Sequence, residues 1–155
     1  MDAALDSTVI PRGIEISKGL AQVSDEKLKG MDGEVVQAPA IEGMYELPDD
    51  SQDMILLHSF LEHEVNPLEL LKASSKKLSK KGLLIIKVPN YESWNRKVRQ
   101  AKWCGFRYPD HVNYFSPKTL KLFIEAANLK VYRMNFFDRI PTSDNVWVIA
   151  ERKSS

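Results

Sequence analysis

Several absences narrow the class of this sequence before any motif is considered. Its single cysteine, Cys104, has no partner for an internal disulfide, and no charged segment followed by a long apolar run opens the chain. No apolar run approaches the roughly 20 residues that cross a bilayer. We therefore expect a reducing, cytoplasmic setting and no membrane span.

The chain also lacks an excess of charge of either sign. Lys and Arg number 22 and Asp and Glu number 21, so the formal net charge is +1. Such a protein has no overall field that would draw it to a phosphate backbone, which disfavours nucleic acid as a partner. Its 155 residues, 43% hydrophobic and 28% charged, are typical of one soluble domain, predicted to span 1–155.

The most informative segment, 47–90, has the pattern of a strand, a loop, a helix and a second strand. Residues 54–58 are apolar on both faces, as in a central strand that helices cover on each side. Residues 66–69 (Asn-Pro-Leu-Glu) predict a capped helix start, and Gly82 predicts the helix end before a strand to Val88. Two parallel strands of this kind end at one rim of a sheet, where open α/β sheets bind ligands.

The rest of the chain continues an α/β rhythm with one interruption. Residues 91–115 form a polar, aromatic insertion, and residues 1–8 carry no periodic signal. The final two strands are joined by a short turn and must be antiparallel, because a parallel crossover needs a dozen or more residues. The remaining predicted strands and helices are strands 12–16, 34–37, 129–137 and 145–151, a helix from Ser17 to about Gly30, and a helix from Ser116 to Asn128.

The order of these elements and the residues at their ends resemble the class I S-adenosylmethionine-dependent methyltransferases. The resemblance covers roughly residues 13–153. Within the family, these residues look most like the branch of quinone-biosynthetic and small-molecule O-methyltransferases. It implies an α/β fold with a Rossmann-like, mostly parallel sheet and an antiparallel C-terminal strand. The motifs that carry it are Gly13–Ser17, Leu47–Pro48 with Ser51–Asp53, Leu61–His63, Asn66–Pro67, the 78–82 helix end, Val88–Asn90 and His111–Ser116.

The same resemblance implies S-adenosylmethionine as cofactor and names residues for it. Glu15 matches the acidic residue that holds the ribose hydroxyls, for which a carboxylate is suited because it accepts two hydrogen bonds. Ile16 would lie against adenine, while His58, Ser59 and Phe60 would lie beside the methionine half. The alternative is that Glu15 is only a solvated residue at a strand end.

The resemblance also assigns the insertion, 91–115, to the element that covers the substrate. In it His111 would take the proton of a substrate hydroxyl during methyl transfer, with Tyr114 beside it, since imidazole titrates near neutrality. The alternative is that His111 only holds the loop through hydrogen bonds to the backbone.

No metal site is expected from the spacing of the histidines. His58 and His63 are five residues apart, whereas the HExxH pattern needs histidines four apart on a helix. Cys104 and His111 lie far from both in the sequence.

One departure from the family pattern is severe. The ribose carboxylate normally follows a glycine-rich loop by about 20 residues, yet only fourteen residues precede Glu15 and the first glycine is Gly13. We therefore expect one N-terminal strand-helix unit to be missing. A competing alignment takes residues 14–19 as a decayed first strand and loop, and makes the second strand the absent one. Residues 38–40 (Ala-Pro-Ala) occupy the place of the acidic residue that contacts adenine, so we expect that contact to be absent.

A gap inside a sheet leaves backbone groups without partners, so something must fill it. The flanking strands close up, residues 1–10 add a strand, or a second chain contributes, which makes a homodimer one solution. The sequence thus predicts an S-adenosylmethionine-dependent methyltransferase of a small polar acceptor. The alternative is a non-catalytic remnant of that fold acting as a binding module.

Overall fold

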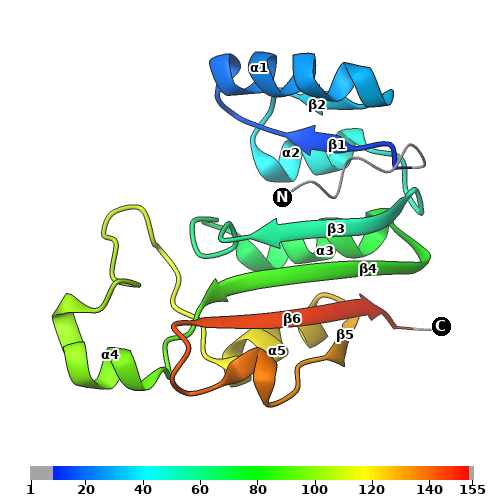
Figure 1. The fold of residues 1–155 in the computed structure, drawn as a ribbon. Helices are drawn as coiled ribbons and strands as arrows, with labels where there is room; N and C mark the ends of the chain where they lie inside the picture. The colour runs from blue at the N-terminus through cyan, green and yellow to red at the C-terminus, as the bar shows by residue number, and fades with distance from the viewer. Residues whose placement is uncertain (1–8, 154–155) are drawn as a thin grey trace. The chain divides into compact units, whose positions relative to one another are not determined.

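The computed structural model describes residues 9–153 and comprises two compact units, divided between Leu47 and Pro48. Each unit is an α/β arrangement, as predicted (Figure 1). The single domain over 1–155 stays a prediction. The predicted irregular start at 1–8 and most of the candidate extra strand at 1–10 lie outside the described residues.

The first unit is built on two short parallel strands, β1 (Arg12–Ile14) and β2 (Glu34–Val36). Helix α1 (Lys18–Leu28) and the 3-10 turn η1 (Lys29–Met31) connect them, and α2 (Ala40–Glu46) follows. In doubly wound sheets of the order 3-2-1-4-5-6 the third strand pairs with the second. The parallel pairing of β1 with β2 is the arrangement expected if they are the second and third strands of such a sheet. Which strand is missing stays a prediction.

The second unit contains a four-stranded sheet in the order β3-β4-β6-β5. The strands are β3 (Gln52–His58), β4 (Leu78–Pro89), β5 (Leu129–Arg133) and β6 (Asn145–Arg152). β3 and β4 are parallel, and β6 is antiparallel to both of its neighbours, β4 and β5. The last strand is thus the reversed one, which confirms the predicted topology.

Two helices cover one face of this sheet (Figure 1). They are α3 (Pro67–Lys77) and α5 (Pro117–Ala126), and right-handed crossovers running in one direction along the sheet place both on the same side. Their side of β4 carries Leu84, Ile86 and Val88, each fully buried. Between β4 and α5 come α4 (Trp94–Arg99) and η2 (Gln100–Lys102), and η3 (Phe137–Arg139) precedes β6.

The prediction that residues 54–58 are buried on both faces is wrong. Ile55 and Leu57 are buried, but Met54 is 62% exposed and Leu56 is 46% exposed. Among the described residues of the second unit, no helix covers that face, and β3 pairs only with β4. The expected absence of one N-terminal strand-helix unit stays a prediction.

Three predicted helix signals act differently in the structure. Helix α3 ends at Lys77, and Gly82 lies inside β4, where a Cβ would come within 2.6 Å of the Gln52 carbonyl oxygen. Helix α1 ends at Leu28, and η1 runs past Gly30, the predicted helix end, as far as Met31. Asp32, which follows, is left-handed with φ 53°. Asn66 precedes α3 but makes no side-chain cap. Of the predicted signals for this helix start, Pro67 at the first helical position is confirmed.

No helix among residues 9–153 is long and apolar enough to cross a membrane.

Candidate functional site

In the first unit, the residues that follow β1 are held by the backbone ladder. The Glu15 N–H donates to the Val36 carbonyl at 3.0 Å, and one Glu15 carboxylate oxygen accepts the Ser17 N–H at 2.7 Å. That contact satisfies a free amide at the start of α1, where Ser17 makes no side-chain cap of its own. One carboxylate oxygen remains for another donor, and Ile16 beside it is 67% exposed.

In the second unit, the residues predicted to line the methionine half form a sharp turn after β3. Ser59 has a φ of 52°, a left-handed conformation uncommon for a residue other than glycine. Its hydroxyl accepts from the Lys87 Nζ at 2.9 Å, and the His58 ring lies 5.5 Å from the Trp147 ring. Phe60, at the tip of the turn, is 39% exposed.

Lys87 and Trp147 are rim residues that the sequence reasoning missed. His58, Lys87 and Trp147 occupy one row across β3, β4 and β6 in the strand register. A lysine inside the otherwise apolar run of β4 was the available signal, because a cation is seldom placed in such a strand without a partner.

Below this turn, the loop that begins at Leu61 meets the end of the insertion. The Val112 and Asn113 N–H groups both donate to the Glu62 carbonyl at 3.0 Å. The His63 and His111 rings are in edge contact, with centroids 4.6 Å apart. His111, 5% exposed, bonds through Nδ1 to the Gly105 carbonyl at 2.8 Å, and His63 bonds through Nδ1 to the Asp110 carbonyl at 2.8 Å.

The alternative expected for His111 is that it only holds the loop through hydrogen bonds to the backbone. Nδ1 of His111 makes such a hydrogen bond. Tyr114 is not the partner of His111 Nδ1 and lies in an aromatic cluster. Its ring centroid is 5.2 Å from that of Phe106 and 5.9 Å from that of Tyr91. Trp103, 2% exposed, completes the cluster at 5.4 Å from Phe106.

Asp144, at the turn before β6, anchors the insertion. Its backbone carbonyl accepts the Asn90 N–H at 2.8 Å, and its carboxylate accepts from four side chains. Burial alone would raise the pKa of this carboxyl, but the four donors together hold the pKa below its usual value. The donors are Trp103 Nε1 at 2.7 Å, Ser93 Oγ at 2.9 Å, Asn95 Nδ2 at 3.1 Å and Cys104 Sγ at 3.6 Å.

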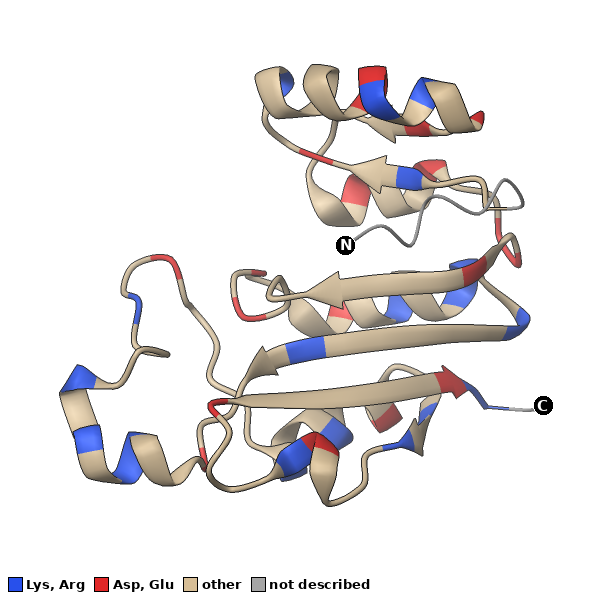
Figure 2. Cartoon of the chain, in the orientation of Figure 1, with Lys and Arg blue, Asp and Glu red and all other residues tan. Residues whose placement is uncertain are grey.

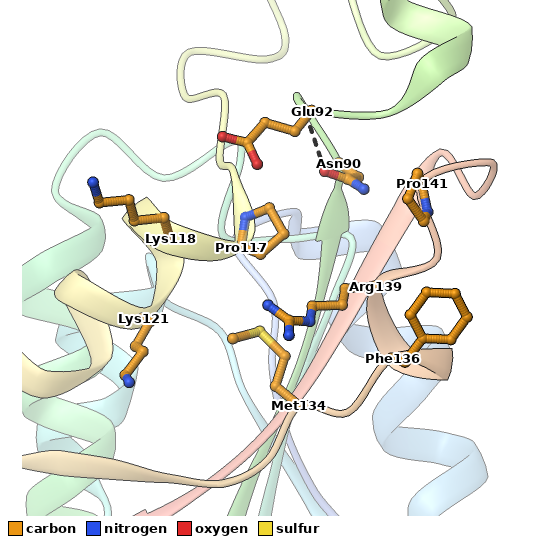
Figure 3. A pocket seen from close by; sticks show the side chains of 9 residues that line it. All are labelled: Asn90, Glu92, Pro117, Lys118, Lys121, Met134, Phe136, Arg139 and Pro141. Carbon is orange, nitrogen blue, oxygen red and sulfur yellow. Dashed lines mark hydrogen bonds between the residues drawn. The ribbon is translucent and has the colours of Figure 1, made fainter.

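A cavity of about 480 Å³ opens beyond the carboxyl end of β4. Figure 3 shows the Arg139 guanidinium and the Glu92 carboxylate pointing into it from opposite sides, with Lys118 and Lys121 at its edge. Three cationic side chains against one carboxylate give it a positive balance. Its lining consists of Asn90, Glu92, Pro117, Lys118, Lys121, Met134, Phe136, Arg139 and Pro141.

The basic residues of the insertion lie mainly on α4, whose last turn carries Arg96, Lys97 and Arg99 (Figure 2). The Arg96 guanidinium stacks on the Tyr91 ring at 4.2 Å, and Trp94 is 57% exposed. Trp103, the other tryptophan of the insertion, is buried.

The structure therefore brings the predicted residues together only in part. His58, Ser59 and Phe60 share one turn, and His111 joins the loop that continues it. Tyr114 lies in the aromatic cluster, and Glu15 and Ile16 follow β1 in the first unit. Their predicted roles toward cofactor and substrate stay predictions.

Comparisons with known proteins agree with this fold. The model of a family described as a methyltransferase domain matches residues 8–133. A SAM-dependent methyltransferase from Archaeoglobus fulgidus is 19% identical with a TM-score of 0.65, and the match covers 91% of this chain and 75% of that one. The CcbJ methyltransferase from Streptomyces caelestis is 13% identical with a TM-score of 0.71, over 92% of this chain and 74% of that one.

A third structure of the same fold is the [4+2]-cyclase SpnF, 13% identical with a TM-score of 0.73, over 99% of this chain and 71% of that one. At these identities the structural likeness establishes the fold alone. No curated protein matches the sequence significantly. The family match, by contrast, spans well over half of the chain.

Proposed function

Since the chain belongs to the methyltransferase-domain family and has the class I S-adenosylmethionine-dependent methyltransferase fold, we propose that it binds S-adenosylmethionine and transfers its methyl group to a small polar acceptor. The observation that carries this proposal is the family match over residues 8–133. In the second unit, polar residues also follow the carboxyl ends of β3 and β4. Ligands of open α/β sheets bind at that end of the strands.

The residues after β1 fit the nucleoside half of this cofactor. Glu15 keeps one carboxylate oxygen for a ribose hydroxyl, because only the other oxygen accepts from Ser17. Ile16 offers an exposed apolar surface to adenine. For the methionine half, the residues of the Ser59 turn are the candidates. The cofactor when bound supplies an electrophilic methyl, and these residues orient it and exclude water.

On the acceptor side, we assign the cavity beyond β4. Asn90 and Arg139 offer hydrogen-bond donors, and the positive balance favours an acceptor that carries a carboxylate or phosphate. His111 and Tyr114 remain the candidates for handling the acceptor's proton. His111 is suited to this only through Nε2, since Nδ1 is bonded to the Gly105 carbonyl.

The second candidate function is a binding module that keeps the fold without methyl transfer. One observation favours it: no glycine among residues 9–153 has a positive φ, so the described chain holds no glycine-rich cradle for the methionine carboxylate. SpnF, a [4+2]-cyclase, shows that this fold also occurs in a protein with a different activity.

Titration calorimetry with S-adenosylmethionine and with its demethylated product separates the two functions. Saturable one-site binding is expected, and Glu15→Gln should weaken it about tenfold by removing a charged hydrogen bond to ribose. The glutamine oxygen still accepts the Ser17 N–H, so the free energy of unfolding should hardly change. Glu46→Gln, an equal change of charge at an exposed residue of α2, should leave affinity unchanged. No heat at millimolar ligand would leave only the binding module.

The acceptor class is tested by a methyl-transfer screen over matched pairs of hydroxylated acids and their amides. The acids should be preferred, and Arg139→Gln should remove the preference by raising KM for the acids with kcat little changed, because the guanidinium binds the acceptor without taking part in the transfer. Lys97→Gln, a cation of α4 outside the cavity, is the matched control. Equal rates for acids and amides in the wild type would refute the assignment of the cavity.

A further inference from the structure

Three side chains with metal-binding atoms converge where the loop after β3 meets the insertion. They are Glu62, His63 and His111, and one ligand atom from each lies within 4.8 Å of the others. His63 follows Glu62 directly, whereas His111 comes from 48 residues further along the chain. The three groups are held in place because Val112 and Asn113 bond to the Glu62 carbonyl.

Both imidazoles are oriented as metal ligands are. Each Nδ1 lies 2.8 Å from a backbone carbonyl, that of Asp110 for His63 and that of Gly105 for His111. A carbonyl oxygen has no proton to donate, so each Nδ1 must carry the hydrogen. The neutral ring then has its lone pair on Nε2. A backbone carbonyl on the other ring nitrogen is the usual support of a metal-bound histidine.

Among the described residues, the Glu62 carboxylate has no cation or hydrogen-bond donor as a partner. Its side chain is 1% exposed, and Oε2 is buried without a hydrogen-bond partner. No hydrogen bond or ion pair joins this carboxylate to another residue in the described part of the chain. A buried, unpaired carboxylate costs several kcal/mol unless a cation or donor meets it. Because a backbone carbonyl takes each Nδ1, Nε2 is the nitrogen that each ring has left for a ligand, and a cation suits these two lone pairs and the carboxylate at once.

From this arrangement we infer that Glu62, His63 and His111 form a binding site for a divalent first-row transition-metal ion, with Zn²⁺ the best match. Two imidazoles and one carboxylate suit zinc and its neighbours, whereas Mg²⁺ and Ca²⁺ prefer oxygen ligands throughout. Three protein ligands leave at least one coordination position open. The site ties the insertion to the loop at the end of β3.

The sequence analysis did not find this site because it tested His63 only as a partner of His58 in the HExxH spacing. His58 lies in the row with Lys87 and Trp147 and contributes nothing to the cluster. The metal site does not depend on the proposed methyl transfer. If both hold, His111 is a metal ligand through Nε2 and cannot take the acceptor's proton, so the open coordination position becomes the place where an acceptor oxygen is bound and polarised.

The test is calorimetry of metal-free protein, prepared with EDTA and dialysed, titrated with ZnCl₂ and with MnCl₂. One ion per chain should bind, and Glu62→Gln should weaken the affinity by about a hundredfold or more, since even changes to supporting groups cost 10 to 100-fold. His58→Gln keeps the cluster and should bind as the wild type does. Cys104→Ser should also bind normally, which excludes zinc capture by the thiol.

Thermal unfolding gives a second readout that a structural role for Glu62 would not produce. Zinc should raise the melting temperature of the wild type and of His58→Gln, but not of Glu62→Gln. Without metal, Glu62→Gln should be at least as stable as the wild type. The substitution removes an unpaired buried charge, and the glutamine side chain has nearly the same shape as glutamate. A wild type that binds neither ion at millimolar concentration, or a Glu62→Gln variant that binds zinc equally well, would overturn the inference. So would a Glu62→Gln variant that is folded only poorly without metal.

Discussion

Replacing Ile86 with alanine is expected to lower the free energy of unfolding of the second unit by about 2 to 5 kcal/mol, as for other large-to-small changes in a packed core. Ile86 is fully buried on the side of β4 that α3 and α5 cover, with Leu57 and Val148 as its register neighbours. Little can move in to fill the space, because the strands on both sides are held by ladder hydrogen bonds. Urea unfolding followed by far-UV circular dichroism measures the loss.

The matched control is Ile85→Ala, one residue away on the opposite face. Ile85 is partly exposed, and its register neighbour on β3, Leu56, is 46% exposed. The same deletion of methyl groups should therefore cost about 1 kcal/mol or less, because the lost burial is smaller. A loss from Ile85→Ala as large as that from Ile86→Ala would contradict the exposed face, and would mean that something covers it in solution.

Asp144→Ala is the second change expected to have a large effect, about 3 kcal/mol of unfolding free energy, because it leaves several donors without a partner. The buried Trp103 Nε1, at 2.7 Å from the carboxylate, is the costliest of them. The insertion should loosen as a whole, and limited proteolysis should cut within 91–115 while the four-stranded sheet stays protected. Asp110→Ala, an exposed carboxyl in the same insertion, is the control and should leave the digestion pattern unchanged.

The same carboxyl should make stability depend on pH in acid. Its folded pKa is lowered from the usual 3.8, because the hydrogen bonds to its charged form outweigh its burial. Its stabilising contribution is thus fully present above about pH 4 and is lost as the pH falls through the lower, folded pKa. Between pH 5 and pH 2 the wild type should lose more unfolding free energy than Asp144→Asn. Parallel losses in the two proteins would show that this carboxyl is not the group responsible.

Local rules of the sequence were enough for the elements whose signals lie within one segment. Ser116 and Pro117 start α5 with a capping box closed by Thr119, as the Ser-Pro pair predicts. The final two strands are antiparallel as predicted, although β5 already ends at Arg133 and the connection over 134–144 contains η3 instead of more strand. The order of strands and helices indicated the family. These features depend on residues a few positions apart, where backbone geometry and chain length leave few alternatives.

Tertiary structure alone decided the features that join distant segments. The sequence offered no way to see that His111 meets Glu62 and His63, or that Asp144 collects donors from four side chains of the insertion. It also placed Gly82 at a helix end, although the close approach of Gln52 is what requires a glycine there. Hydrogen bonds, buried charge and close contacts depend on distances in space, and sequence periodicity carries no record of those distances until the strands are paired.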